Sequence, residues 1–271
     1  MATRLGRAIS IIAKNVAGRE RGRRLSSTVE KYRKFWAAKT DFRIRSNTPE
    51  FRRLSVAELK LLIGERTPAS ILEIGCGNGQ FFDYLGFSRR SYRGVDFSSR
   101  MLAVFRQNHP ELDLVEAEGS SYLDDRSYDL ILAYDVVSQF SPAMLAQHCR
   151  NARRMMHPES LLVWTCILWR SLRHTYDLGM WSNSGRASII RWAKSQVRRM
   201  AGGDLMGRWY TPHEIDRIAR QNFLCASFYG SMTYPYRFHA VLQKEMPGRA
   251  TGVWPGQRRL ATHALQEVSA G

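Results

Sequence analysis

A glycine-rich turn and a downstream acidic residue are the features of this sequence whose spacing points most clearly to chemistry. Gly75, Gly77 and Gly79 alternate directly after a short apolar run. Without Cβ atoms, such a turn lets a ligand approach the backbone closely. Asp96 ends the next apolar run, at the place where an acidic side chain accepts hydrogen bonds from a ribose diol. Together these residues predict a site for a cofactor that contains a nucleoside.

The spacing of the glycines separates two classes of cofactor. Nicotinamide and flavin enzymes use G-x-G-x-x-G, and Gln80 stands where their third glycine belongs. The segment that starts at Glu73 instead resembles the E/D-x-G-x-G-x-G motif of the class I S-adenosylmethionine-dependent methyltransferases. The resemblance covers residues 70–167 well and residues 209–243 loosely. It implies a methyl-transferring enzyme with S-adenosyl-L-methionine as its cofactor.

Further landmarks of this family follow along the chain. The resemblance implies that Glu118 faces the adenine amino group, although the family more often has Asp there, and that the backbone of Gly119 also contacts the base. Tyr134 belongs to a segment that resembles the fourth strand and the loop facing the sulfonium. Cys76 is expected to contribute its backbone and its small size. The complete set of expected cofactor-binding residues is Glu73, Gly75, Cys76, Gly77, Asp96, Phe97, Met101, Glu118, Gly119 and Tyr134.

A hydroxyl acceptor must also lose a proton, and the reaction then needs a base. Asp135, His213 and His239 are the candidates. Asp135 directly follows the predicted fourth strand, where ligands meet open α/β sheets. For His213 a polar residue at a helix end is the alternative interpretation, and for His239 a polar residue facing out of a strand.

Alternating apolar runs and helical segments must position these residues. They predict an α/β, Rossmann-like, doubly wound and mainly parallel seven-stranded sheet, with an N-terminal helical extension and an insertion after the fifth strand. We expect strands near residues 70–74, 92–96, 112–116, 129–134, 161–167, 223–229 and 236–243. Helices are expected near residues 79–86, 99–107, 142–156 and 212–220. The expected regions are a basic amphipathic arm (1–24), a helical lid (25–69), a methyltransferase domain (70–246) with a cap (170–208), and a loose tail (247–271).

Charge and cysteine content limit the partners. The formal net charge is +17, and residues 70–169 are acidic in balance while the segments on either side are basic. Such flanks favour anionic partners: nucleic acid, anionic lipid or an anionic small molecule. The four cysteines form no CxxC pair, which argues against a metal site and a disulfide framework and favours a reducing compartment. No apolar run is long enough to predict a membrane-spanning helix.

Two basic segments carry an apolar stripe at helical spacing, residues 1–24 and residues 186–200. Such helices are typical of contact with an anionic membrane surface. The alternatives are a basic tail for residues 1–24 and a helix packed on the catalytic domain for residues 186–200. The expected location is cytoplasmic, at the membrane surface if these segments bind lipid, or mitochondrial if residues 1–24 are a presequence.

Three hypotheses for function remain open at this point. The first is O-methylation of a small or lipid-linked anionic acceptor, such as a glycan or a secondary-metabolite precursor. The second is methylation of RNA or DNA, which the charge favours, although the sequence has no Asn/Asp-Pro-Pro-Tyr/Phe tetrad and no recognisable RNA-binding module. The third is a cofactor-fold subunit that binds or assembles without catalysis.

Overall fold

The computed structural model of the chain describes residues 49–64, 66–86, 91–172, 207–234 and 236–244. The expected arm (1–24), the expected helix at 186–200 and the expected tail (247–271) lie outside the described residues. The expected lid is described from Pro49 onward, where it forms the helix α2 (Pro49–Ile63).

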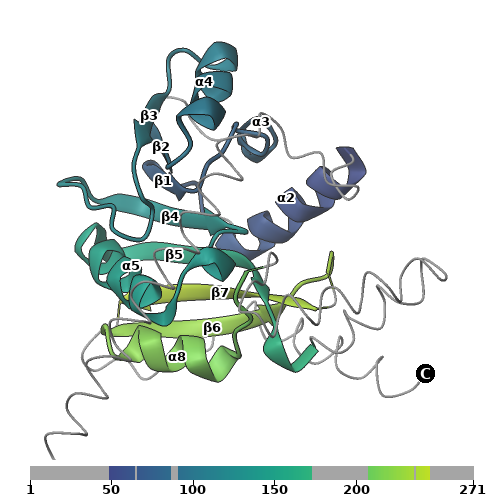
Figure 1. Cartoon of the computed structure of the whole chain (residues 1–271), viewed down its shortest axis with the longest axis vertical. Helices are drawn as coiled ribbons and strands as arrows, with labels where there is room; N and C mark the ends of the chain where they lie inside the picture. Colours follow the sequence, from purple (N-terminus) through teal and green to yellow (C-terminus); the bar gives the residue numbers. More distant parts are fainter. Residues whose placement is uncertain (1–48, 65, 87–90, 173–206, 235, 245–271) are drawn as a thin grey trace, which may run out of the picture.

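A seven-stranded sheet forms the centre of the molecule, with the strand order β3-β2-β1-β4-β5-β7-β6 (Figure 1). Strands β1 to β5 pair in parallel, and β7 is antiparallel to both β5 and β6. The strands are β1 (Ile71–Ile74), β2 (Tyr92–Asp96), β3 (Asp113–Glu116), β4 (Tyr128–Tyr134), β5 (Met156–Leu168), β6 (Leu224–Gly230) and β7 (Arg237–Lys244). The predicted α/β sheet and the place of each strand along the chain are confirmed.

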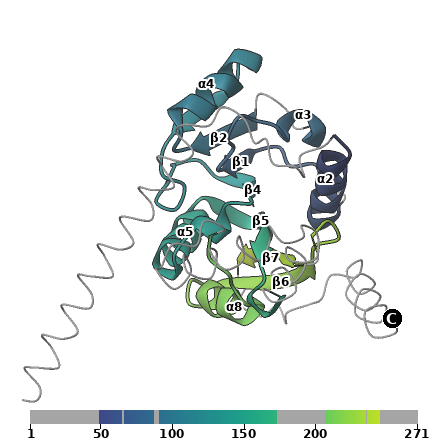
Figure 2. The ribbon, with the colours of Figure 1, turned by 45° about the vertical axis from the view of Figure 1, so that its right-hand side comes forward.

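Helices cover both faces of this sheet, as Figure 2 shows with α2 and α3 on one side and α5 on the other. One core cluster joins the strands to α2, α3 and α4, and a second joins them to α5 and α8. The additional helices are α3 (Phe82–Leu85), α4 (Ser99–Asn108), α5 (Pro142–Arg154) and α8 (Pro212–Arg220). Within the described part of the chain, no helix has the length and apolar character needed to cross a membrane.

Two element boundaries differ from the prediction. Helix α3 begins at Phe82 and not near residue 79, because the left-handed backbone at Gly77 and Gly79 keeps the preceding turn out of helical geometry. Strand β5 begins at Met156, where a helix was expected to end. Its pairing with β4 shifts register before Leu161, and the shifted stretch contains Pro158, which has no N–H to donate to a neighbouring strand.

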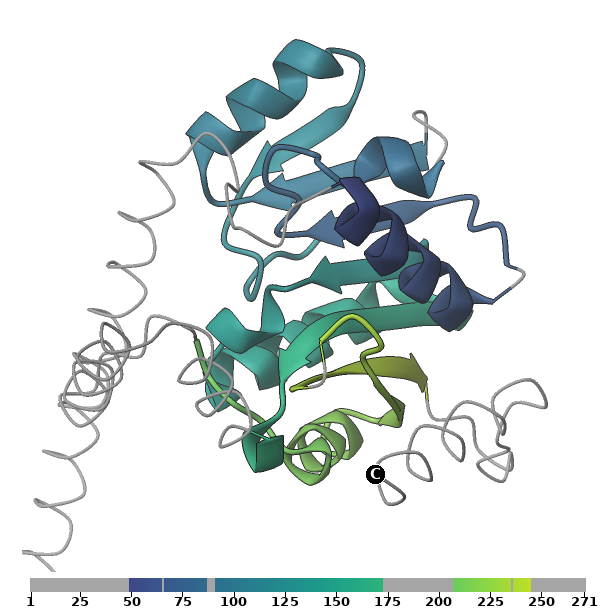
Figure 3. The ribbon, with the colours of Figure 1, turned by 90° about the vertical axis from the view of Figure 1, so that its right-hand side faces the viewer.

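The parallel strands bring their carboxyl ends to one edge of the sheet. Since β7 is antiparallel to β5, its first residue, Arg237, pairs with Leu168 at that same edge. Helix α2 lies across one face of the sheet (Figure 3). The residues that follow β1, β2, β3 and β4 therefore meet residues from the beginning of β7 at one edge, where open α/β sheets bind their ligands.

Candidate active site

The turn after β1 has a backbone conformation that favours glycine at three positions. The φ angles of Gly75, Gly77 and Gly79 are +75°, +56° and +75°. A Cβ on Gly75 would lie 2.1 Å from Cγ2 of Val136, and a Cβ on Gly79 would lie 2.1 Å from the ring of Phe105. Packing within the protein thus already requires two of the three glycines. The backbone N–H of Gly77 instead donates to the neighbouring acidic residue.

Asp96 joins this turn to the end of β2. Its Oδ2 accepts the N–H of Gly77 at 2.9 Å and its Oδ1 accepts the N–H of Ser98 at 2.8 Å. The side chain is 9% exposed, and burial raises its pKa although the two N–H groups oppose this. Each carboxylate oxygen has two lone pairs, so both oxygens can accept a further hydrogen bond. The residue therefore fits the ribose-binding role that the sequence predicts.

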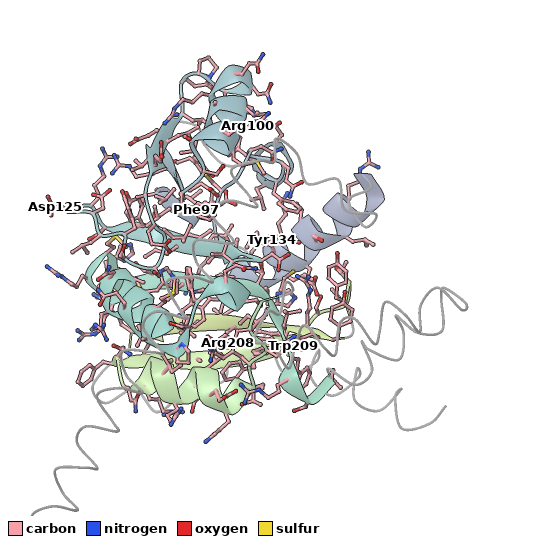
Figure 4. The ribbon with its side chains drawn as sticks, viewed as in Figure 1. Phe97, Arg100, Asp125, Tyr134, Arg208 and Trp209 are labelled. Atoms are coloured by element: carbon pink, nitrogen blue, oxygen red, sulfur yellow. The ribbon has the colours of Figure 1, made fainter. Side chains whose placement is uncertain are left out.

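Removal of this carboxylate provides a test of that role. Asp96→Ala is expected to weaken S-adenosylmethionine binding by about 1–3 kcal/mol, the usual cost of losing hydrogen bonds to a charged group. Calorimetric titration measures the change, and thermal unfolding verifies that the variant is folded. Asp125→Ala removes an exposed carboxylate from the loop before β4, which Figure 4 shows at the left edge of the view, and serves as the control. An unchanged affinity of Asp96→Ala would remove Asp96 from the cofactor site.

Glu73 is a second buried acid beside the turn. Its Oε2 accepts the hydroxyl of Tyr92 at 2.5 Å. Burial raises the pKa of Glu73 to about 7, and the charge of Asp96 adds to the shift. Cys76, which follows in the turn, is also buried, and burial raises the pKa of its thiol. Its Sγ would lie 2.9 Å from a Cβ on Gly94, so the small side chain fills the space between turn and sheet.

The raised pKa of Glu73 makes a prediction about stability. The folded protein retains the proton between about pH 4.5 and pH 7 while the unfolded chain loses it, so this carboxyl lowers stability as pH rises through that window. Two to three pKa units correspond to about 3 kcal/mol. Glu73→Gln is expected to stabilise the cofactor-free protein by that amount at pH 8 and to have little effect at pH 5. Denaturant unfolding at both pH values measures it, and equal differences at the two pH values would contradict the prediction.

The residues expected around adenine follow β2 and β3. Ser98 caps α4 by accepting the N–H of Met101 at 3.3 Å, and the side chain of Met101 is buried. Glu118 Oε1 accepts the N–H and the hydroxyl of Ser120 at 3.3 and 3.2 Å. A Cβ on Gly119 would lie 2.4 Å from Cγ2 of Ile74, so glycine lets this loop approach the end of β1. Phe97 is partly exposed.

The end of β4 presents an aromatic residue and an acid. The rings of Tyr134 and Phe81 lie 4.3 Å apart, and Figure 4 shows Tyr134 close to α2. Asp135 has a φ angle of +53°, an uncommon conformation for a residue other than glycine. Its Oδ1 accepts a hydrogen bond from Nη1 of Arg237 at 2.6 Å. The side chain of Asp135 is 43% exposed and that of Arg237 is 11% exposed, so a mostly buried cation anchors an accessible carboxylate.

The two histidines expected as candidate bases have different surroundings. His239 is buried, its Nδ1 accepts the N–H of Cys166 at 3.2 Å, and its Nε2 lies 3.0 Å from Oε1 of Glu58. Both ring nitrogens therefore face groups of the fold and not the solvent. His213 is exposed in the first turn of α8. The base role of each histidine stays a prediction.

Three features of the site were missed in the sequence. Arg237 pairs with Asp135, and Glu58 lies beside His239. The rings of Tyr234 and Tyr236 lie against Arg237, with their centroids 5.6 Å apart, and the ring of Trp209 lies 6.4 Å from that of Tyr236. Glu58 has a signal in the sequence, because it shares the buried face of α2 with apolar residues at helical spacing.

One family model matches the part of the chain that contains the glycine turn. Residues 72–164 match the family model described as a methyltransferase domain. This segment contains the glycine turn, Asp96, Glu118 and Asp135. Glu58 and Arg237 lie outside it. No curated protein sequence matches the chain.

Solved structures share the fold at low sequence identity. DhpI in complex with SAM and HEP is 14% identical, with a TM-score of 0.56, and the match covers 81% of this chain and 97% of DhpI. An S-adenosylmethionine-dependent methyltransferase from Clostridium acetobutylicum is 11% identical, with a TM-score of 0.54 and coverage of 75% and 95%. A Nostoc punctiforme protein assigned as an O-methyltransferase is 18% identical, with a TM-score of 0.52 and coverage of 72% of this chain. The chain spans 57% of the length of the Nostoc protein.

Proposed function

We propose that this chain transfers a methyl group from S-adenosylmethionine to an oxygen atom of a small anionic acceptor. The chain belongs to the class I S-adenosylmethionine-dependent methyltransferases by its match at residues 72–164 and by its fold. The observation that carries the proposal is the accessible carboxylate of Asp135 at the end of β4. A hydroxyl acceptor needs a group that takes its proton, and a positioned carboxylate supplies one.

The residues expected to bind the cofactor suit this chemistry. The turn from Gly75 to Gly79 would hold the cofactor by its backbone, Asp96 would accept the ribose hydroxyls, and Glu118 would face the base. The bound cofactor supplies a strongly electrophilic methyl group. The protein then has to align the attacking oxygen with that group, exclude water and remove a proton. Asp135 is preferred as the base over His239, because the carboxylate of Asp135 is 43% exposed whereas His239 is buried with Nδ1 bonded to Cys166.

An exposed cation bonded through its backbone to the segment that follows Asp135 favours an anionic acceptor. Arg237 is paired with Asp135 and Arg170 with Glu214, the latter at 2.9 Å. Arg208 is exposed and makes no ion pair with another described residue. Its backbone N–H donates to the carbonyl of Ser138 at 2.5 Å, which brings it to the segment that follows Asp135. Figure 4 shows Arg208 in the same region as Trp209. A carboxylate or phosphate on the acceptor would suit this guanidinium.

Two of the structural neighbours are named for chemistry that agrees with the proposal. The Nostoc protein is assigned as an O-methyltransferase, and another neighbour is the pyocyanin biosynthetic protein PhzM, at 16% identity and a TM-score of 0.51. Low identity restricts this support to the fold. The acceptor class proposed here therefore depends on Asp135 and Arg208 of this chain.

The experiment is a screen of acceptors with the purified full chain. S-adenosylmethionine is supplied together with hydroxylated carboxylic acids, sugar phosphates, lipid-linked glycans or RNA, and release of S-adenosylhomocysteine is measured. Turnover with a hydroxylated small anion, and none with its methoxy analogue, is the expected result. Turnover confined to lipid-linked glycans would replace the small acceptor by a lipid-linked one. Turnover confined to RNA, or to amines, would overturn the proposal.

A further inference from the structure

Helix α2 carries a buried carboxylate, that of Glu58, which lies against β7 and the connection that precedes it. Glu58 is 4% exposed and lies among the apolar side chains of that helix, including Leu59 and Leu62. A carboxylate in such a place costs free energy unless hydrogen bonds satisfy it. An apolar side chain would fill the same space without that cost. The groups that hydrogen-bond the Glu58 carboxylate should therefore explain why a charge stands at this position.

Glu58 accepts three hydrogen bonds from the β6–β7 connection and lies beside His239 of β7. Its Oε1 accepts the N–H of Met232 at 2.5 Å and lies 3.0 Å from Nε2 of His239. Its Oε2 accepts the hydroxyls of Thr233 at 2.9 Å and Ser231 at 3.3 Å. Burial opposes the charge, but the hydrogen bonds with His239 and Met232 outweigh it, so the pKa of Glu58 is lowered. One side chain thus attaches α2 to both the β6–β7 connection and β7.

His239 extends this attachment to β5. Its Nδ1 accepts the N–H of Cys166, and its other ring nitrogen, Nε2, lies 3.0 Å from Oε1 of Glu58. Cys166 has a φ angle of +59° within the irregular stretch of the β5–β7 pairing. The carbonyl of Cys166 accepts a hydrogen bond from Nη1 of Arg237 at 3.3 Å. The histidine therefore helps to fix the backbone group that orients Arg237.

The β6–β7 connection also holds Arg237 directly. The N–H of Ser231 donates to the carbonyl of Arg237 at 3.0 Å, and the N–H of Arg237 donates to the carbonyl of Tyr234 at the same distance. The guanidinium lies 4.6 Å from the ring centroid of Tyr234. A continuous set of contacts consequently leads from Glu58 through this connection and Arg237 to the carboxylate of Asp135.

We propose that Glu58 and His239 are positioning residues through which α2 holds Arg237 against Asp135 and so orients the acceptor side of the active site. The inference rests on the proposed function, because Asp135 is the group taken to receive the acceptor's proton. In this proposal both residues act through Arg237 and Asp135 and not by contact with the reacting atoms. Their effect is on where Arg237 and Asp135 lie.

The test compares two variants that each neutralise a buried carboxylate. Glu58→Gln keeps the size of the side chain but turns an NH2 group toward a site that has only donors around it. Asp124→Asn is the matched control: the side chain of Asp124 is 7% exposed and accepts hydrogen bonds from Tyr122 and Tyr128, beside the start of β4 and away from the acceptor edge. Glu58→Asp tests rescue, since it restores the charge one carbon shorter.

For Glu58→Gln we expect a fall in kcat/KM for the acceptor of about tenfold or more, with the cofactor Kd within twofold of the wild type. Asp124→Asn should lose a comparable amount of stability but keep the wild-type kcat/KM for the acceptor. Glu58→Asp should recover part of the activity that Glu58→Gln loses. Both variants are assayed under conditions in which they are folded. If kcat/KM for the acceptor falls equally in Glu58→Gln and Asp124→Asn, Glu58 has only a structural role and the inference is overturned.

A second measurement does not depend on the acceptor. Amide hydrogen exchange of residues 231–234 and of Arg237 should accelerate by about tenfold or more in Glu58→Gln and stay unchanged in Asp124→Asn. Unchanged exchange at these amides would overturn the positioning role whatever the acceptor proves to be. If the wild type methylates nitrogen, the proposed function fails, yet the exchange data and the kinetic comparison with that acceptor still decide the role of Glu58.

Discussion

Replacement of Asp135 by asparagine is expected to lower kcat for O-methylation by about 10²–10⁴-fold, the usual contribution of a positioned base. Asparagine has nearly the same shape, and its carbonyl oxygen can still accept the hydrogen bond from Arg237. It cannot take a proton. The change therefore removes the proposed chemistry and preserves most of the geometry.

Single-turnover kinetics at saturating cofactor measures this effect, because it reports the chemical step and not product release. Cofactor affinity, measured by calorimetry, should stay within about twofold of the wild type, since Asp135 is not among the expected cofactor-binding residues. Asp125→Asn makes the same replacement at an exposed position and should leave both quantities unchanged. Wild-type turnover in Asp135→Asn would show that the proton leaves by another route.

Gly77→Val is expected to abolish cofactor binding, with no saturation at about 100 times the wild-type Kd, a loss of at least about 3 kcal/mol. The φ angle of Gly77 is +56°, where a β-branched residue is strongly disfavoured. The branched side chain would also enter the space in which a ligand approaches the backbone of the turn. Gly75 is less suitable for this test, because a Cβ there would already collide with Val136 in the free protein.

A control variant at a second glycine distinguishes the effect of backbone strain from the loss of the ligand site. Gly64 follows α2 with a φ angle of +73°, and a Cβ there would meet no atom within 4 Å. Gly64→Val therefore carries similar strain away from the turn. We expect it to lower the unfolding temperature but to bind S-adenosylmethionine normally. Binding by Gly77→Val with wild-type affinity would contradict the assignment of the cofactor to this turn.

Local signals in the sequence were sufficient to predict that the glycine turn and Asp96 lie together. The glycines follow β1 directly, and Asp96 ends β2, so strand positions alone bring them together once the sheet is parallel. The start of α8 was equally local: Thr211, Pro212 and Glu214 predict a capping box. In the structure the N–H of Glu214 donates to Oγ1 of Thr211 at 3.2 Å, and the N–H of Thr211 donates to Oε2 of Glu214 at 2.8 Å.

The acceptor side could not be predicted in the same way, because its contacts join distant parts of the chain. Asp135 and Arg237 are separated by 102 positions, and Glu58 and Met232 by 174. Which polar groups pair across a sheet depends on strand order and direction. Only the antiparallel placement of β7 next to β5 brings Arg237 to the same edge as Asp135. The sequence pattern left that direction open.

Transfer of a methyl group from S-adenosylmethionine to an acceptor oxygen can be tested directly with a ¹³C label in the methyl group of the cofactor. The purified chain is incubated with this cofactor and the acceptor found by the screen, and NMR locates the label in the product. A labelled methoxy group, formed by the wild type and reduced by at least about 100-fold in Asp135→Asn, is the predicted result. A label on nitrogen, or a methoxy product formed equally fast by Asp135→Asn, would contradict the account.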